Sequence, residues 1–335
     1  MVIKTPLLLL HAILLLVMFV AALASLAVGQ VDLTLANVWD GLVQHSNSLN
    51  YIIISEIRLP RTLLAIVVGA ALGISGAAMQ GFLRNPLAEP GLLGVTGGAA
   101  LGAVVAIYSG LILLGEYWLP VLAMLGATSA VALTYALAGR QYSGSHTLIL
   151  AGIAVSSLFG AAIAVALNLA PNPFAAMDVV FWLMGSLADR TMQQFWLVIP
   201  FIVIGGGLML SCIRALNALS LGETTAQSMG IEIAQVQWRL ALGVALAVGA
   251  AVSVAGSIGF VGLVVPHILR PLVGHSPGAL LLPSAIGGAI LLLLADITVR
   301  LVPTSGMELR IGVVTALIGA PFFLLLLLHH RREVA

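Results

Sequence analysis

The sequence contains very few charged residues. Lysine and arginine total 13 and aspartate and glutamate total 12 among 335 residues, so 7% of the chain is charged, against about 25% in a soluble domain. A mean hydropathy of +1.16 leaves no polar coat for a surface that faces water. This composition excludes a soluble globular protein and indicates a membrane protein. A net charge of +1 also argues against nucleic acid as a partner.

Cysteine and the motifs of nucleotide and metal chemistry are also scarce. Cys212 is the only cysteine, which excludes a disulfide framework and a thiolate metal cluster. No segment matches the phosphate-binding pattern GxxxxGK[ST], so we expect ATP to be hydrolysed by another polypeptide. We interpret His267, inside an apolar run, as a hydrogen-bonded interior residue rather than a metal ligand. We therefore expect no catalytic residue, no metal and no cofactor in this chain.

Long apolar runs make up most of the chain. A membrane-spanning helix needs about 20 apolar residues, and backbone groups in lipid must be hydrogen-bonded internally, so each run predicts a helix. The sequence predicts an all-α membrane protein, a ten-helix polytopic bundle that forms one transmembrane domain over residues 1–335. The predicted spans are 7–29, 61–81, 92–114, 117–139, 147–169, 194–213, 239–258, a short one at 260–270, 280–300 and 308–328.

Two apolar stretches need separate interpretation. The first run resembles a secretory signal, but a signal has an apolar core of only about 7–15 residues, so we interpret 7–29 as an uncleaved helix. Pro171 and Pro173 predict a break after the fifth run. We interpret the aromatic stretch 179–185 that follows as an interfacial or re-entrant turn. Three tryptophans fit an aromatic belt at one interface: Trp118, Trp182 and Trp196.

Glycine is frequent, with 36 residues, and small residues let membrane helices approach closely. Residues 69–77 resemble residues 249–257, and on alternating spans the two copies run in opposite directions. This is typical of the inverted repeats of transporters, and we place the repeat halves at roughly 58–170 and 238–330. With the N-terminus in the cytoplasm, more basic residues fall inside than outside, as the positive-inside rule requires. We therefore expect both termini in the cytoplasm.

Charges near the ends of spans are candidates for function. Arg58 and Arg61 flank Pro60 where the second span begins. They either anchor lipid headgroups or dock an acidic partner from outside, and we favour docking because guanidinium groups match carboxylates. Asp296 and Arg300 are four residues apart and share one helix face. Charges inside a span are usually functional, but this pair can equally be a structural ion pair.

The polar loop at 216–230 is a candidate contact for a partner. Gly222 and Gly230 punctuate it, and the stretch from Glu223 to Met229 predicts one short amphipathic helix across the cytoplasmic face. The loop is either a simple connection or a knob that inserts into a cleft on a motor subunit. We favour the knob.

Five stretches of the sequence, in order, resemble one family. The chain resembles the permease subunits of ATP-driven importers for vitamin B12, ferric siderophores and haem, the FecCD type of ABC importer. The resemblance covers nearly the whole chain, and the set is specific although no single piece is. The stretches are RLPR at 58–61, NPLAEPGLLG at 85–94, LGE at 221–223, GFVGLVVPHILR at 259–270 and GVVTALIGAP at 312–321.

The resemblance implies a type II importer fold in the bacterial inner membrane, with several partners. These are two ATPase subunits that bind ATP and magnesium, a periplasmic or lipoprotein substrate-binding protein, membrane lipid and a second permease. We expect the second permease to be a copy of this chain, with a paralogous partner as the alternative.

The resemblance also implies site residues. The ATPase-coupling element corresponds to Ser220, Leu221, Gly222, Glu223, Thr224, Thr225, Ala226, Met229 and Gly230. Docking of the binding protein corresponds to Arg58, Arg61 and Arg300, and we add Arg310, which stands where family members have proline and is compatible with an anionic cargo or an acidic docking face. The fifth and tenth spans line the path in the family, which places Ser156, Phe159, Asn168, Thr315 and Ile318 near the substrate.

We therefore expect an importer permease that carries an iron chelate, a ferric siderophore or haem, with cobalamin as the alternative. An ion-coupled secondary transporter would need ionisable groups deep in the bundle. Asp296 is the only acid inside a predicted span, apart from Glu308 at an end. A membrane-embedded enzyme would need converging nucleophile, base or metal ligands, and the sequence shows none.

Overall fold

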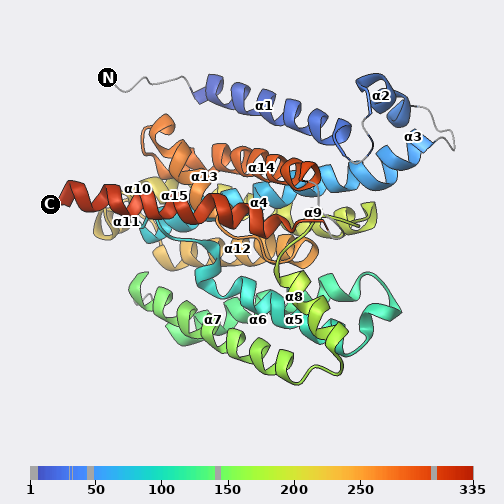
Figure 1. The fold of residues 1–335 in the computed structure, drawn as a ribbon. Helices are drawn as coiled ribbons and strands as arrows, with labels where there is room; N and C mark the ends of the chain where they lie inside the picture. Colours follow the sequence, from blue (N-terminus) through green and yellow to red (C-terminus); the bar gives the residue numbers. More distant parts are fainter. Residues whose placement is uncertain are drawn as a thin grey trace.

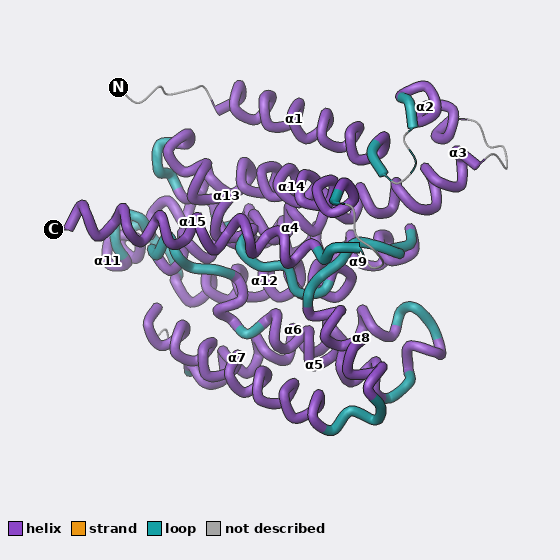
Figure 2. The backbone as a smooth tube through the Cα atoms, in the orientation of Figure 1, coloured by secondary structure: helices purple, strands orange, loops and turns teal. Residues whose placement is uncertain are grey.

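The computed structural model describes residues 7–29, 31, 33–43, 49–139, 145–302 and 308–334. Within these ranges the chain is helical and contains no strand (Figure 2). This confirms the predicted fold class. Seven of the described helical segments are long and apolar enough to cross a membrane. They are α1 (Leu7–Ala27), the continuous segment Leu49–Leu83, α6 (Trp118–Ala138), α7 (Ser145–Asn168), α9 (Met192–Ser211), α12 (Ile233–Ala255) and α14 (Pro277–Leu301).

The remaining helices complete the bundle. Each of the ten predicted ranges overlaps a helix, but only seven described segments meet the length and hydropathy of a span, so the count of ten is not confirmed. The other apolar helices are α5 (Val95–Tyr108), α8 (Pro173–Leu183), α13 (Val261–Leu269) and α15 (Ile311–Val334). The peripheral ones are α2 (Leu35–Val43), α3 (Leu49–Tyr51), α10 (Ile213–Leu219) and α11 (Glu223–Ser228).

The predicted third span, 92–114, is wrong as a single helix. α5 fills only its middle, between the 3₁₀ turns η2 (Pro90–Leu93) and η3 (Leu111–Leu114). Gly94 and Gly110 adopt left-handed backbone angles, with φ of 76° and 71°, which a right-handed helix cannot contain. A helix of 14 residues is about 21 Å long, and the hydrocarbon core is about 30 Å thick.

The second span is longer than predicted and occupies the centre of the bundle. The π-helical segment η1 (Ile52–Arg58) runs directly into α4 (Leu59–Leu83), so that one rod extends from Leu49 to Leu83. Pro60 lies in the first turn of α4, directly after the π-helical segment. α4 packs against α14, α12, α13 and α9, and most of its residues are buried.

The helices form a thick slab with α4 inside it (Figure 1). α1 lies at one edge and packs on α14; α12 and α9 cover the other side of α4; α6, α5 and α7 follow toward the opposite edge. The start of α1, the end of α15 and α11 lie at one end of the slab. Which end faces the cytoplasm stays a prediction, and the basic residues Lys4 and Arg140 lie outside the described residues.

Small residues bring helix backbones into contact, as predicted. A Cβ on Gly69 would lie 2.3 Å from the carbonyl oxygen of Gly288, and one on Gly73 would lie 2.0 Å from that of Ser284. α4 and α14 therefore touch along their backbones, and α5 and α6 make the same kind of contact. Such close packing is what associates helices in lipid, where no hydrophobic force acts between them.

The segment after α7 corrects two interpretations. The break at the prolines is confirmed, because Asn172 caps α8 by accepting a 2.9 Å hydrogen bond from the Ala175 N–H. The stretch 179–185 is not a turn, since most of it belongs to α8, which is too short to cross a bilayer. Trp182 does not belong to an interfacial belt, because it is 9% exposed, whereas Trp118 and Trp196 are 42% and 63% exposed.

The two similar segments, 69–77 and 249–257, lie largely on two helices that pack together. Residues 69–77 belong to α4 and residues 249–255 to the end of α12, and α4 and α12 run in opposite directions (Figure 1). The repeat halves stay a prediction.

Candidate functional site

The predicted coupling element forms a short projecting helix. α11 covers Glu223–Ser228, within one residue of the predicted helix, between Gly222 with φ of 108° and Gly230 with φ of 79°. Ala226 is completely buried, whereas Leu221 and Met229 are 66% and 62% exposed. The remaining predicted residues follow this pattern: Thr224 and Thr225 are exposed, and the Ser220 hydroxyl donates to the Asn217 carbonyl. The element therefore packs against the rest of the chain through the small side chain of Ala226, and it exposes the large apolar side chains of Leu221 and Met229.

An ion pair ties this element to the central rod. Arg84, which ends α4 in a left-handed conformation with φ of 50°, places its Nη2 2.7 Å from Glu223 Oε1. Both side chains are partly exposed, at 43% and 30%. On the predicted topology Arg84 is one of the basic residues on the cytoplasmic side. Its pairing with Glu223 was not predicted, because 139 residues separate the two.

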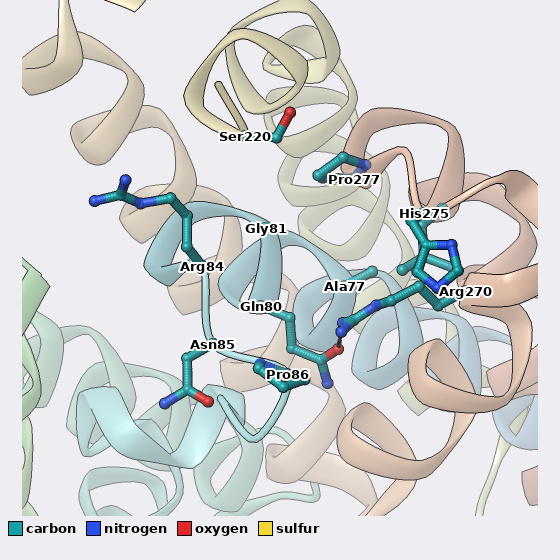
Figure 3. A pocket seen from close by; sticks show the side chains of 11 residues that line it. Ala77, Gln80, Gly81, Arg84, Asn85, Pro86, Ser220, Arg270, His275 and Pro277 are labelled. Atoms are coloured by element: carbon teal, nitrogen blue, oxygen red, sulfur yellow. Dashed lines mark hydrogen bonds between the residues drawn. The ribbon is translucent and has the colours of Figure 1, made fainter. Parts of the chain in front are cut away.

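A polar pocket of about 210 Å³ opens between the end of α4, the end of α10 and the start of α14 (Figure 3). Arg270 reaches into it and donates to the Gln80 Oε1, and the Gln80 Nε2 donates to the Gly262 carbonyl at 3.1 Å. This contact was also missed. The signal was present, because Gln80 is a polar residue near the end of a very apolar helix.

At the opposite end of α4, Arg58 is 5% exposed and bound within the chain. Its Nη1 donates to the carbonyls of Leu26 at 2.8 Å and Ala27 at 2.6 Å, and its Nη2 donates to the Val31 carbonyl. Leu26 and Ala27 are the last two residues of α1 and Val31 lies just beyond it, and the last carbonyls of a helix lack partners within the helix. Arg58 therefore caps α1.

Arg61 joins two acids. Its Nε donates to Asp296 Oδ1 at 2.8 Å, and its two terminal nitrogens donate to the Glu308 carboxylate at 3.1 and 2.6 Å. Asp296 is completely buried and Arg61 is 9% exposed, whereas Glu308 is 28% exposed. The bidentate geometry is the strong form of an arginine–carboxylate pair.

Arg300 completes this cluster. Its Nη2 lies 2.7 Å from Asp296 Oδ2, an ion pair without hydrogen-bond alignment, and 2.6 Å from the Ser25 hydroxyl. Its Nη1 donates to the carbonyls of Ser25 and Val28 at 2.7 and 3.0 Å. Asp296 and Arg300 thus form the predicted pair on one helix face, and the cluster ties α14 to both α1 and α4.

Arg310 has a different environment. Its guanidinium carbon lies 5.1 Å from the centre of the Phe181 ring, a cation–π distance. Burial lowers the pKa of the neighbouring Arg190, Asp189 opposes this, and Arg310 lowers that pKa further. Of the four predicted docking residues, only Arg310 has a side chain with no ion pair or hydrogen bond among the described residues. The docking role of all four stays a prediction.

The five predicted path residues do not gather at one cavity. Ser156 donates to the Gly91 carbonyl at 3.4 Å and Phe159 packs near Gly97. Thr315 is buried and its hydroxyl donates to the Gly312 carbonyl at 3.2 Å. Asn168 is exposed, and Ile318 is 45% exposed. Their role in the path stays a prediction.

An apolar groove of about 600 Å³ lies along α15. None of the five predicted path residues lines it, although it includes their neighbours on α15. Two backbone hydrogen bonds of 3.1 Å, from the Ile311 N–H to the Gly185 carbonyl and from the Gly312 N–H to the Met184 carbonyl, hold the start of α15 at its edge. The groove is lined by Leu183, Met184, Ser257, Gly259, Phe260, Gly312, Val313, Ala316, Leu317, Ala320 and Pro321.

Two further groups border this region. The Glu89 carboxylate accepts a 3.1 Å hydrogen bond from the Phe260 N–H. Burial raises the pKa of Glu89, and this hydrogen bond opposes the shift. His267 packs edge-on against Phe322, with 5.5 Å between ring centres. Its Nδ1 is buried without a hydrogen-bond partner among the described residues, so the predicted hydrogen bonding of His267 is not observed.

Comparisons with known proteins agree on one family. Residues 14–329 match the family model described as the FecCD transport family. The chain is 45% identical to the vitamin B12 import system permease protein BtuC of Citrobacter koseri, over 83% of each chain. It is 38% identical to the hemin transport system permease protein HmuU of Yersinia pestis, over 96% of this chain and 95% of HmuU. A solved structure described as an inward-facing ABC transporter of the metal-chelate type matches with a TM-score of 0.84 and 33% identity, over 95% of this chain and 98% of that one.

Proposed function

The chain belongs to the FecCD transport family and is an ABC importer permease rather than an enzyme, and on this premise we propose that it carries a metal chelate through the inner membrane. Its partners are two ATPase subunits, which bind ATP and magnesium, and an outer substrate-binding protein. A second copy of the chain completes the path. Both termini face the cytoplasm.

The observation that carries this proposal is the form of α11. A helix of six residues projects from the bundle with Leu221 and Met229 exposed beside it. An exposed apolar pair on a short knob fits a cleft on another subunit. When ATP draws the two ATPases together, each pulls on α11. The Arg84–Glu223 pair passes that displacement to α4, the central rod.

A charge swap tests this coupling. Glu223→Arg places two guanidinium groups where the ion pair stood, so uptake by the complete complex in proteoliposomes falls while ATP hydrolysis continues. Adding Arg84→Glu restores an ion pair of reversed polarity and restores uptake. Glu232→Arg, a charge reversal at an exposed position just beyond α11, is the control. Undiminished uptake by the Glu223→Arg variant contradicts the assignment, and a defect that the double variant keeps shows that Glu223 acts without Arg84.

We propose an iron chelate, a ferric siderophore or haem, as the cargo. The groove along α15 is apolar and about 600 Å³ in volume, which suits a bulky ligand delivered by a binding protein and released again. The likeness to HmuU over 96% of the chain supports haem, whereas the higher identity to BtuC supports cobalamin as the second candidate. Uptake of hemin, a ferric siderophore and cyanocobalamin by the reconstituted complex, with and without ATP, separates them.

The same assay tests the ion-coupled alternative. Asp296, the acid inside a span, is engaged by Arg61 and Arg300, which leaves it poorly suited to bind a transported proton or cation. Uptake that requires ATP supports the importer. Uptake that persists without ATP and stops when the ion gradient is collapsed supports a secondary transporter instead.

The outer arginines remain candidates for docking the binding protein. Arg310 is the most available of them, while Arg58, Arg61 and Arg300 would have to exchange intrachain partners for those of the binding protein. Arg310→Glu therefore weakens docking more than Arg58→Gln does. Equal affinities of both variants for the binding protein at low salt would count against Arg310.

A further inference from the structure

The polar pocket beside α11 carries more positive charge than the chain itself balances. Its lining contains two arginines, a histidine and two side-chain amides, and no carboxylate (Figure 3). Its volume of about 210 Å³ is far above the roughly 15 Å³ that one water needs. The lining residues that matter below are Gln80, Asn85, Arg270 and His275.

Arg270 is the centre of this imbalance. It is half-buried, and the one hydrogen bond of its side chain in the described structure goes to the neutral amide oxygen of Gln80. No described carboxylate lies within ion-pair distance of it, unlike Arg61, Arg84 and Arg300. Guanidinium groups withdrawn from water are normally paired with an anion. Arg270 therefore has free N–H donors directed into a pocket that lacks any protein anion.

Two other polar side chains of the lining lie on either side of this space. Figure 3 shows the His275 ring beside Arg270, and Asn85 across the pocket. The Asn85 Oδ1 is taken by the Leu87 N–H at 2.9 Å, which leaves its NH₂ group to donate. Arg84 is different, because its guanidinium points away from Arg270 and is held by Glu223. The ligating set is thus Arg270 with His275, while Asn85 lies at the rim of the pocket with its amide nitrogen turned away from Arg270.

The wider surroundings have the same sign of charge. Arg214 and Arg239 lie in α10 and α12, on either side of α11, and are exposed. The exposed acid of this region is Glu232, and Glu223 is occupied by Arg84. The apolar side chains of Ile268, Leu272 and Leu282, on the elements that border the pocket, are 53%, 44% and 46% exposed. A ligand here meets positive charge at its head and lipid-facing apolar surface beside it.

We propose that this pocket binds a phosphate-bearing anion, with Arg270 as the principal ligand and His275 as a further donor. Arginine forks match phosphate oxygens in pairs, and basic pockets between membrane helices bind phosphate headgroups. The phosphate comes either from the headgroup of an anionic phospholipid or from the aqueous phase. The site does not depend on the importer assignment, since it rests on the pocket and its charges alone.

The test uses the purified full-length chain in nanodiscs. One sample contains only phosphatidylcholine and receives inorganic phosphate, and the other contains phosphatidylglycerol in phosphate-free buffer. Thermal unfolding is followed by tryptophan fluorescence for the unaltered protein and for Arg270→Gln, His275→Gln and Arg239→Gln. The last variant removes an exposed arginine at the same end and serves as the charge-matched control. Direct titration gives the Kd.

We expect an anion-dependent rise of the melting temperature in the unaltered protein and in Arg239→Gln. Arg270→Gln weakens anion binding about tenfold, the loss of one charge-assisted hydrogen bond. Without any anion, Arg270→Gln is at least as stable as the unaltered protein, because it removes an unbalanced charge. If Arg270 served only to hold Gln80 by a hydrogen bond, Arg270→Gln would instead be less stable than the unaltered protein. A response to phosphatidylglycerol alone identifies a lipid headgroup, and a response to inorganic phosphate identifies a soluble anion. Equal responses in Arg270→Gln and the unaltered protein, or no response to either source, overturn the proposal.

Discussion

Asp296→Asn tests whether the cluster of Arg61, Asp296 and Arg300 holds together the end of the bundle opposite α11. The substitution keeps the shape of the side chain and removes the one fully buried negative charge between Arg61 and Arg300. Those two side chains are 9% and 7% exposed, so little water can replace the lost partner. Breaking a buried ion pair from one side costs about 3–5 kcal/mol. We expect a loss of stability in this range.

Glu308, the second acid bound to Arg61, provides a comparison for Asp296 within the same cluster. Glu308→Gln also removes a carboxylate from Arg61, but Glu308 is 28% exposed and solvent screens the pair. Partial exposure lowers the worth of this pair below that of the fully buried one, although its geometry is bidentate. The structure therefore predicts that Asp296→Asn is more destabilising than Glu308→Gln. The double variant Asp296→Asn with Arg300→Gln recovers part of the loss, because it removes the cation that Asp296→Asn leaves without a carboxylate, whereas Arg61 keeps Glu308.

Unfolding of the purified full-length protein in a mild detergent, measured as a function of temperature and of denaturant, gives these differences. The order of the two single variants is the decisive result. If Asp296→Asn is as stable as the unaltered protein, or if Glu308→Gln lowers stability more than Asp296→Asn does, then the buried ion pairs of Asp296 do not stabilise the bundle as their burial indicates. A double variant less stable than Asp296→Asn alone would show that Arg300 contributes mainly through Ser25 and Val28.

Two further predictions concern the centre of the bundle. Gly76→Ala prevents accumulation of folded protein, because the added Cβ would lie 1.9 Å from the Gly262 carbonyl oxygen. Gly206→Ala is tolerated, because no atom lies within 4 Å of the added Cβ. Size-exclusion profiles of both variants check this. Glu89→Gln changes how stability depends on pH. Because burial raises the pKa of Glu89, the folded state binds its proton more tightly than the unfolded state, and stability falls as pH rises from the unfolded toward the folded pKa. The melting temperature of Glu89→Gln therefore exceeds that of the unaltered protein at pH 8 and not at pH 4, and a constant offset would contradict the reasoning.

The sequence was most informative where local chemistry decides the structure. Apolar runs locate every predicted helix because lipid admits no unpaired backbone. Gly222 and Gly230 mark the two ends of the predicted coupling element, because both adopt positive φ. The failure at 92–114 has the same local origin, since Gly94 and Gly110 interrupt an apolar run without changing its hydropathy. A hydropathy profile cannot tell a glycine that packs inside a helix from one that ends it.

The partners of Arg58 and Arg61 could not be predicted from the sequence. Arg61 meets Asp296 and Glu308 across 235 and 247 residues, and Arg58 binds three backbone carbonyls that have no side-chain signature. Both contacts depend on which helices are neighbours, and periodicity does not determine this. The expectation that guanidinium groups in this region meet carboxylates was chemically sound. The structure supplies carboxylates for Arg61 and Arg300 from within the chain itself.

The contacts of α4 give displacement of α11 a physical route to the groove. Arg84 joins the end of α4 to α11, and Gly76, two turns back along α4, rests against Gly262 of α13 without space for a methyl group. α13 begins directly after Phe260, whose ring lines the groove and presses on Gly319 of α15. Packed interiors transmit strain rather than absorb it. A pull on α11 therefore reaches the wall of the groove through contacts between rigid helices, and none of these steps needs a flexible segment among the residues that the structure describes.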